Sequence, residues 1–108
     1  MTDKGPIIFK CEDSLWQMLA DGSKAFDMRR WDLSDDRISR LARGRLAGQD
    51  EWQPDESTVS FNNKATGEIL TFDYVGVEFT EWAPEWGFIL LGARVADSVA
   101  SGRFIRTD

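Results

Sequence analysis

A lysine, an aspartate and an arginine, spaced by three and then two residues, are the side chains best suited to chemistry. Lys24, Asp27 and Arg29 lie in the stretch GSKAFDMRRWD, residues 22–32. A lysine and an arginine can hold a phosphate or a carbonyl oxygen, and a carboxylate can accept a hydrogen bond from an exocyclic amine. Two neighbouring cations also favour the ionised form of the aspartate. The pattern predicts either a ligand-binding cleft or a solvated strand face whose ion pair contributes about 0–1 kcal/mol.

The residues around this motif predict a strand over residues 24–31. Alternate side chains of a strand point to opposite faces. We therefore expect Phe26 and Met28 to face the core, and Asp27 and Arg29 to project together on the other side.

Further ligand-binding candidates follow the motif. Arg30 adds a cation, and Trp31 either stacks on a base or packs at the end of the strand against the next helix. Tyr74 and Glu78 are candidates for a second polar group in the cleft. Gly76 lies between them and predicts a bulge or bend, so the face on which each of them lies stays open.

A segment rich in arginine comes next. Residues 34–48 predict a helix capped by Ser34, with a narrow apolar stripe and with arginines around the rest of its circumference: Arg37, Arg40, Arg43 and Arg45. Residues 24–45 contain seven basic and four acidic residues, a local charge of +3, which leaves −9 for the rest of a chain with net charge −6. The arginines fit three roles: contacts with a phosphate backbone, ion pairs with nearby acids, or a protein-binding surface.

The chain contains no histidine and one cysteine. The lack of histidine excludes Ser-His-Asp and Cys-His mechanisms and removes the commonest metal ligand, so neither a metal site nor a cofactor is expected. Cys11 is expected to be a small buried residue, because no histidine can activate it. No run of 18 apolar residues and no signal-peptide pattern occurs, which predicts a cytoplasmic protein without a membrane contact.

A length of 108 residues predicts a single domain, here over residues 1–96, followed by a C-terminal tail, residues 97–108, that frays. A helix capped by Ser14 and ended by Gly22 is expected near the N-terminus, and a polar loop over residues 49–57. The remaining apolar patterns predict strands over residues 7–11, 58–63, 69–79 and 87–95. This order indicates an α+β fold, either a small curled sheet or a barrel.

Together with this order of elements, GSKAFDMR resembles the signature of the ASCH domain: glycine–any–lysine–any–any–acid–any–arginine, where the acid is usually glutamate. The stretches NKATGEILTFDYVGVEF and WGFILLGARV resemble the end of small ASCH-like proteins from bacteria and phages, in which a Thr-Gly turn leads into two long strands. The resemblance covers roughly residues 7–95. Family members continue from the arginine into a short loop and a strand, so the arginine-rich helix is an insertion relative to them.

The resemblance implies a small PUA-like β-barrel with two helices, which binds RNA or a nucleotide in a cleft lined by Lys24, Asp27 and Arg29. One branch of the family consists of amidohydrolases that act on the modified nucleoside N4-acetylcytidine; there the motif lysine is catalytic and a threonine at the acid position is the nucleophile. An enzyme with an aspartate at that position would use Lys24 as general base or electrostatic stabiliser, assisted by Asp27 or Glu78. The third alternative is a small phage or bacterial protein that binds a protein partner on the same scaffold.

Overall fold

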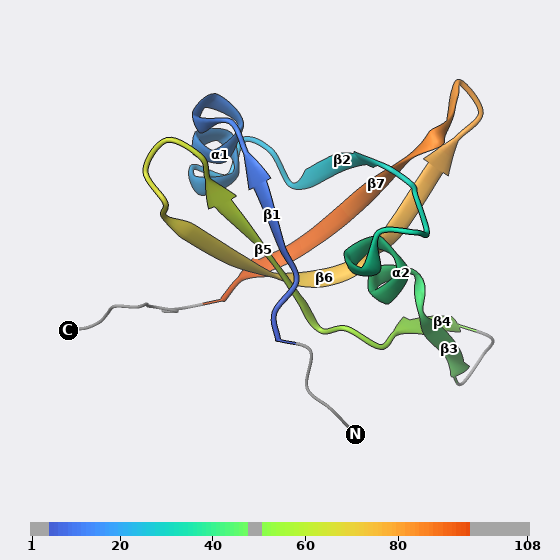
Figure 1. The fold of residues 1–108 in the computed structure, drawn as a ribbon. Helices are drawn as coiled ribbons and strands as arrows, with labels where there is room; N and C mark the ends of the chain where they lie inside the picture. The colour runs from blue at the N-terminus through green and yellow to red at the C-terminus, as the bar shows by residue number, and fades with distance from the viewer. Residues whose placement is uncertain (1–4, 48–50, 96–108) are drawn as a thin grey trace.

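Five strands form one curled sheet in the computed structural model, which describes residues 5–47 and 51–95 (Figure 1). β1 pairs with β5 in parallel, and every other neighbouring pair is antiparallel. The strand order is β1 (Ile8–Cys11), β5 (Thr58–Asn63), β6 (Ile69–Thr80), β7 (Ala83–Arg94) and β2 (Phe26–Arg30). The sheet curls into a half-barrel whose two edge strands are β1 and β2, and this confirms the prediction of an α+β fold with a curled sheet.

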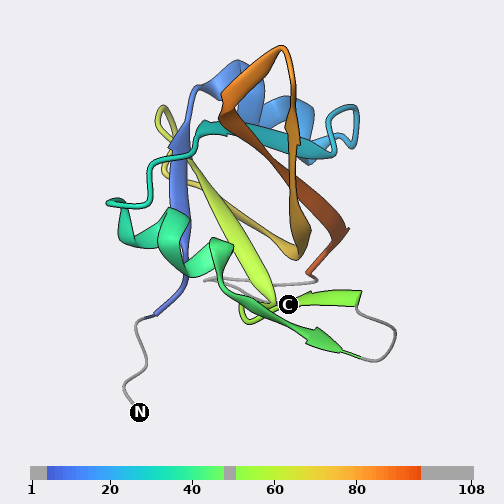
Figure 2. The same cartoon turned by 90° about the vertical axis from the view of Figure 1, so that its right-hand side faces the viewer.

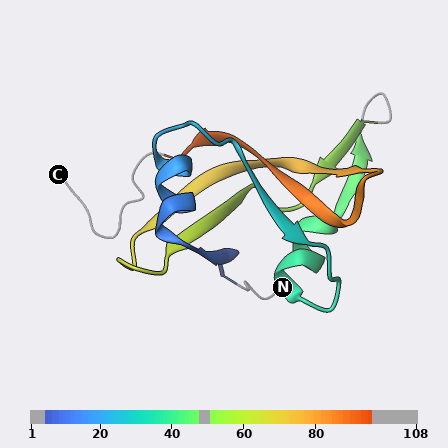
Figure 3. The same ribbon diagram turned by 90° about the horizontal axis from the view of Figure 1, so that it is seen from above.

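Two helices occur in the part of the chain that the structure describes, α1 (Asp13–Ala20) and α2 (Asp36–Ala42), and they lie at opposite ends of the curled sheet (Figure 3). Trp16 and Leu19 are the buried residues of α1, and the indole N–H of Trp16 donates to the carbonyl of Phe61 at 3.0 Å. Apolar side chains from α1, α2 and four strands form one core, which includes Phe9, Leu41 and Ile89.

Both predicted helix starts are wrong by one or two residues. α1 begins at Asp13, whose carboxylate accepts from Gln17, and Ser14 does not cap it. α2 is capped by Asp35, which accepts from the backbone N–H of Arg37, and not by Ser34. The prediction that Gly22 follows the end of α1 in a left-handed conformation is confirmed by its φ of 85°.

The arginine-rich segment departs most from expectation. The helix ends at Ala42, and β3 (Gly44–Ala47) pairs with β4 (Glu51–Pro54) in a hairpin that projects from the α2 side of the sheet (Figure 2). The prediction of a helix is therefore wrong from residue 43 to 47, and the prediction of a loop is wrong over residues 51–54; residues 48–50 lie outside the described residues. Arg43 adopts an extended conformation, and Gly44 permits the ring of Trp52 to lie directly against the backbone, since a Cβ there would be 2.3 Å from it.

The C-terminal half follows the sequence more closely. β6 and β7 are long antiparallel strands, and the register shifts between Tyr74 and Gly76, which confirms the predicted bulge. No helix among the described residues is long and apolar enough to cross a membrane. The predicted tail, residues 97–108, lies outside the described residues.

Candidate functional site

Strand β2 turns its charged side chains inward, so the predicted orientation of this strand is wrong. Asp27 is only 4% exposed and lies opposite the fully buried Ile89, whereas Phe26 and Met28 are 38% and 43% exposed. Strand alternation determines which residues share a face, but it does not determine which face is buried. Asp27 can be buried because a cation on the same face accompanies it, as buried charges require.

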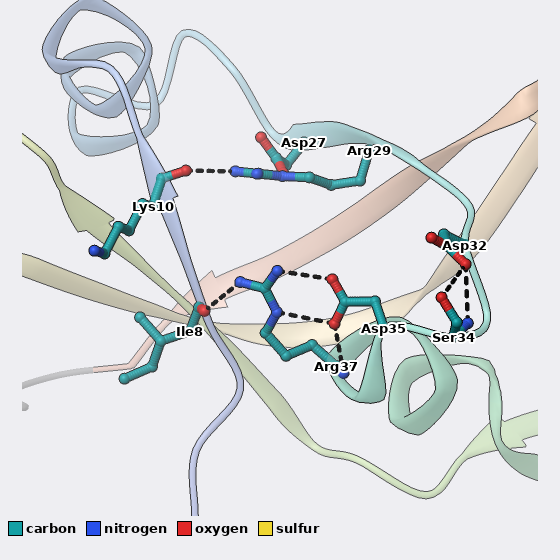
Figure 4. Close-up of polar contacts among 8 residues, drawn as sticks. All are labelled: Ile8, Lys10, Asp27, Arg29, Asp32, Ser34, Asp35 and Arg37. Carbon is teal, nitrogen blue, oxygen red and sulfur yellow. Dashed lines mark hydrogen bonds and ion pairs between the residues drawn. The ribbon is translucent and has the colours of Figure 1, made fainter.

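That cation is Arg29, which connects the two edge strands. Its Nε donates to Oδ2 of Asp27, and its Nη2 donates to the backbone carbonyl of Lys10 on β1 at 2.9 Å (Figure 4). Within residues 5–47 and 51–95, no strand covers this edge of β1, because β1 is at the end of the sheet. A side chain of β2 therefore satisfies a carbonyl that a neighbouring strand would satisfy in a closed barrel.

Arg37 on α2 makes the same kind of contact with the carbonyl two residues earlier on β1. Its Nη1 donates to the carbonyl of Ile8 at 3.0 Å, and its Nε and Nη2 form a bidentate pair with Asp35 (Figure 4). This pairing lowers the pKa of Asp35 below its ordinary value. The two guanidinium carbons lie 4.7 Å (Arg29) and 4.4 Å (Arg37) from the ring centroid of Phe9. We call Arg29, Arg37 and the two carbonyls the arginine seam.

The charges of the three motif side chains, Lys24, Asp27 and Arg29, all act on the pKa of the Cys11 thiol, so they lie in one region of the molecule. Nζ of Lys24 lies 5.4 Å from the ring centroid of Phe26, whose side chain is on the face opposite Asp27. Glu78 is exposed and pairs in register with Phe88, the outward neighbour of Ile89. Of the residues predicted for catalysis, Glu78 therefore lies on the opposite face of the sheet from Asp27.

Tyr74 is buried and holds α2 in place. Its hydroxyl donates to the backbone carbonyl of Leu41 at 2.7 Å. Burial raises the pKa of Tyr74 to about 12. The bulge at Gly76 places Tyr74 in the core and Glu78 outside, although a regular strand would put both on one face.

The four arginines that were predicted to contact a phosphate backbone or a protein partner divide into two pairs. Arg37 belongs to the seam, and Arg40 is buried, pairs with Glu56 and donates to the carbonyl of Gly5 at 2.7 Å. Arg43 and Arg45 are exposed. Arg45 pairs with Asp55 at 3.5 Å, and the side chain of Arg43 has no partner within residues 5–47 and 51–95. Arg40 is therefore the one of the four that is buried, whereas the side chain of Arg37 remains 42% exposed.

A groove opens where α2, the β3–β4 hairpin and the ends of β2 and β6 meet. It has a volume of about 390 Å³ and is lined by Trp31, Ala42, Trp52, Val77 and Phe79. Trp31 meets Phe79 edge-to-face, with ring centroids 5.4 Å apart. We call this feature the aromatic groove.

Glycines set the positions of both tryptophans. A Cβ at Gly87 would lie 2.4 Å from Cε3 of Trp31, so this ring rests on bare backbone, as Trp52 rests on Gly44. Neither indole N–H finds an acceptor among the described residues, unlike that of Trp16. The sequence analysis identified Trp31 as a candidate and missed Trp52 and Phe79, because the hairpin that places Trp52 was interpreted as a loop.

Cys11 is buried, as expected. Burial raises the pKa of its thiol, and the nearby carboxylate of Asp27 raises it further. The thiol is therefore protonated at neutral pH and a poor nucleophile. No cluster of three or more histidine, cysteine or acidic side chains that could hold a metal ion occurs in the described parts of the chain.

No protein-family model matches this chain, and no curated protein or solved structure is significantly similar to it. The function is therefore argued from the geometry of the seam and the groove.

Proposed function

We propose that this protein is a small binding module for single-stranded RNA or a nucleotide, and that it holds a base in the aromatic groove. The observation that carries the proposal is the pair of tryptophans, Trp31 and Trp52, that line one groove and rest on glycine backbone. Base–aromatic stacking contributes about 1–3 kcal/mol per base. Rings that are already held in place lose little conformational entropy when a ligand stacks on them.

A cation lies near Trp31, which directly follows strand β2. Arg29 precedes Trp31 by two residues, which corresponds to about 7 Å along a strand. Its side chain remains 26% exposed, and its Nη1 has no acceptor among the described residues. A phosphate attached to a base on Trp31 can therefore reach a guanidinium that is already oriented.

Membership of the ASCH and PUA-like group is part of this proposal. The curled half-barrel with β2 at its edge is compatible with a small barrel of that kind. In our proposal the motif has a different role from the one that the resemblance implies: Asp27 and Arg29 join the edge strands, Arg29 also contacts the phosphate, and the base stacks on Trp31. Binding is favoured over amide hydrolysis because the two candidate catalytic carboxylates, Asp27 and Glu78, lie on opposite faces of the sheet.

A protein-binding role is the second candidate, and a different surface favours it. Phe26, Met28 and Trp82 are exposed on the outer side of β2 and β7, where Trp82 is 76% exposed and packs against Phe88. Large exposed apolar side chains that gather on one face are typical of interaction sites. This surface lies on the opposite face of the sheet from Trp31.

The test is a titration of a fluorescein-labelled single-stranded RNA of mixed sequence, followed by anisotropy at 50 and 200 mM salt. We expect binding by the wild type that weakens with salt, and a loss of roughly 5- to 150-fold in W31A and W52A, the equivalent of about 1–3 kcal/mol. W82A is the matched control, because it removes a more exposed tryptophan outside the groove. Absence of wild-type binding at 50 mM salt, or an equal loss in W82A, would overturn the proposal.

A further inference from the structure

We infer that the aromatic groove selects an unpaired purine and distinguishes bases by ring size instead of by their hydrogen-bonding edge. This inference rests on the proposed function and concerns the same groove. It follows from the chemistry of the five lining side chains, Trp31, Ala42, Trp52, Val77 and Phe79.

None of these five side chains carries a hydrogen-bond acceptor. Their polar side-chain atoms are the two indole N–H groups, which are donors only. The exocyclic amines of adenine and cytosine therefore gain no side-chain partner in the groove. The acceptor expected for such an amine, Asp27, is 4% exposed and is already paired with Arg29. The amine groups of the Watson–Crick edge are consequently not read by side chains at this site.

Ring area then decides affinity. Stacking depends on the aromatic surface that is removed from water, and a bicyclic purine offers more of it than a pyrimidine. The orthogonal rings of Trp31 and Phe79, with an interplanar angle of 84°, provide one flat wall and one edge at the same place. A bicyclic base therefore covers more of the wall and of the edge than a single ring does.

The base must also be unpaired. A base inside a duplex is already stacked on both faces, so its rings cannot meet Trp31 or Trp52 unless it leaves the stack. The volume of about 390 Å³ lies near the lower end of the range of small-molecule pockets. A mononucleotide, or one extruded residue of a single strand, therefore fits the groove better than a helix does.

The experiment is competition by AMP, GMP, CMP and UMP, and by single-stranded and double-stranded oligomers, against the labelled RNA. We expect AMP and GMP to compete with affinities within about threefold of each other, and CMP and UMP to compete at least about fivefold more weakly. The double-stranded oligomer should compete more weakly than either of its separate strands. W52A and the ring-retaining variant W31F should reduce the purine preference, whereas W82A should keep it. W31F is included because removal of the whole ring at position 31 can disturb the strand end.

The outcomes separate this inference from the function on which it rests. Equal competition by purines and pyrimidines, or a difference above about tenfold between AMP and GMP, overturns selection by ring size and leaves RNA binding intact. A purine preference that survives in both W52A and W31F places the base elsewhere and also overturns the inference. If the wild type binds no labelled RNA at all, the proposed function fails as well.

Discussion

The guanidinium of Arg29 on β2 donates to the backbone carbonyl of Lys10 on β1 at 2.9 Å, although these strands are the opposite edges of one sheet. Arg37 makes the equivalent contact with Ile8. Exposed edges of a sheet present unpaired carbonyls that can recruit other strands. Here two side chains occupy the carbonyls: Arg29 connects the two edge strands, and Arg37 connects α2 to β1. The motif of Lys24, Asp27 and Arg29 therefore contributes to the structure of the sheet.

The first prediction concerns the neighbouring arginines of β2. Arg29→Ala leaves the buried carboxylate of Asp27 without its partner and frees a carbonyl of β1, and breaking a buried pair in this way costs about 3–5 kcal/mol. Arg30→Ala removes a side chain that is 65% exposed and pairs with Glu85 at 3.7 Å, a loss of about 0–1 kcal/mol. Urea unfolding followed by circular dichroism measures both. Equal losses in the two variants would show that the seam does not stabilise the fold.

The second prediction concerns Tyr74, the one tyrosine of the chain. Tyr74→Phe removes its hydrogen bond to Leu41 and should lower the free energy of unfolding at pH 7 by roughly 1 kcal/mol. Burial raises the pKa of Tyr74 to about 12 in the folded protein, from 10 in the unfolded chain. As the pH rises, the unfolded state therefore loses the phenolic proton before the folded state does. Wild-type stability should therefore fall between pH 10 and 12 by more than that of the variant.

The absorbance of phenolate near 295 nm checks this directly, since one tyrosine supplies the whole signal. We expect a midpoint near 12 in the folded protein and near 10 in urea. A folded midpoint near 10 would mean that Tyr74 is accessible to solvent, in which case α2 is not anchored through this hydroxyl.

The third prediction concerns the backbone beneath Trp31. Gly87→Ala places a Cβ 2.4 Å from the indole, so the ring must move, and overpacking of this kind costs about 1–3 kcal/mol. The same variant should weaken nucleotide binding if the position of Trp31 matters. Gly92→Ala on the same strand is the matched control, because its nearest contacts are 3.2 Å and involve Asp73 and Val75, far from the groove along β7. Thermal unfolding and the anisotropy titration report the two effects, and normal binding by Gly87→Ala would contradict a role for a fixed Trp31.

The sequence predicted those features that depend on neighbouring residues. The apolar runs of residues 58–63, 69–79 and 87–95 form strands, Gly22 adopts a positive φ, and Gly76 marks a bulge. Each of these follows from local preferences. Apolar residues form a strand when its side chains are buried, and a glycine adopts a positive φ because it has no Cβ.

The hairpin of β3 and β4 was not predictable in the same way. The arginines after α2 continue a helical pattern, and the residues around Trp52 are polar enough for a loop. The hairpin places Trp52 against Gly44 and near Gly76, with 3.5 Å from its ring to a Cβ at that position. Such contacts between distant residues override weak local propensity.

The sequence by itself determined that Asp27 and Arg29 share one face of a strand, because the alternation of side chains is a property of the local backbone. Only the tertiary structure decided that this face points inward. The edge of β1 presents two carbonyls without a strand beside them, and the guanidinium groups of Arg29 and Arg37 satisfy both. Arg29 pairs with the buried carboxylate of Asp27 and donates to the carbonyl of Lys10, which lies 19 residues away along the chain. Because a buried charge needs such a partner, and the fold alone brings β1 beside Arg29, the local sequence does not reveal which face of β2 is buried.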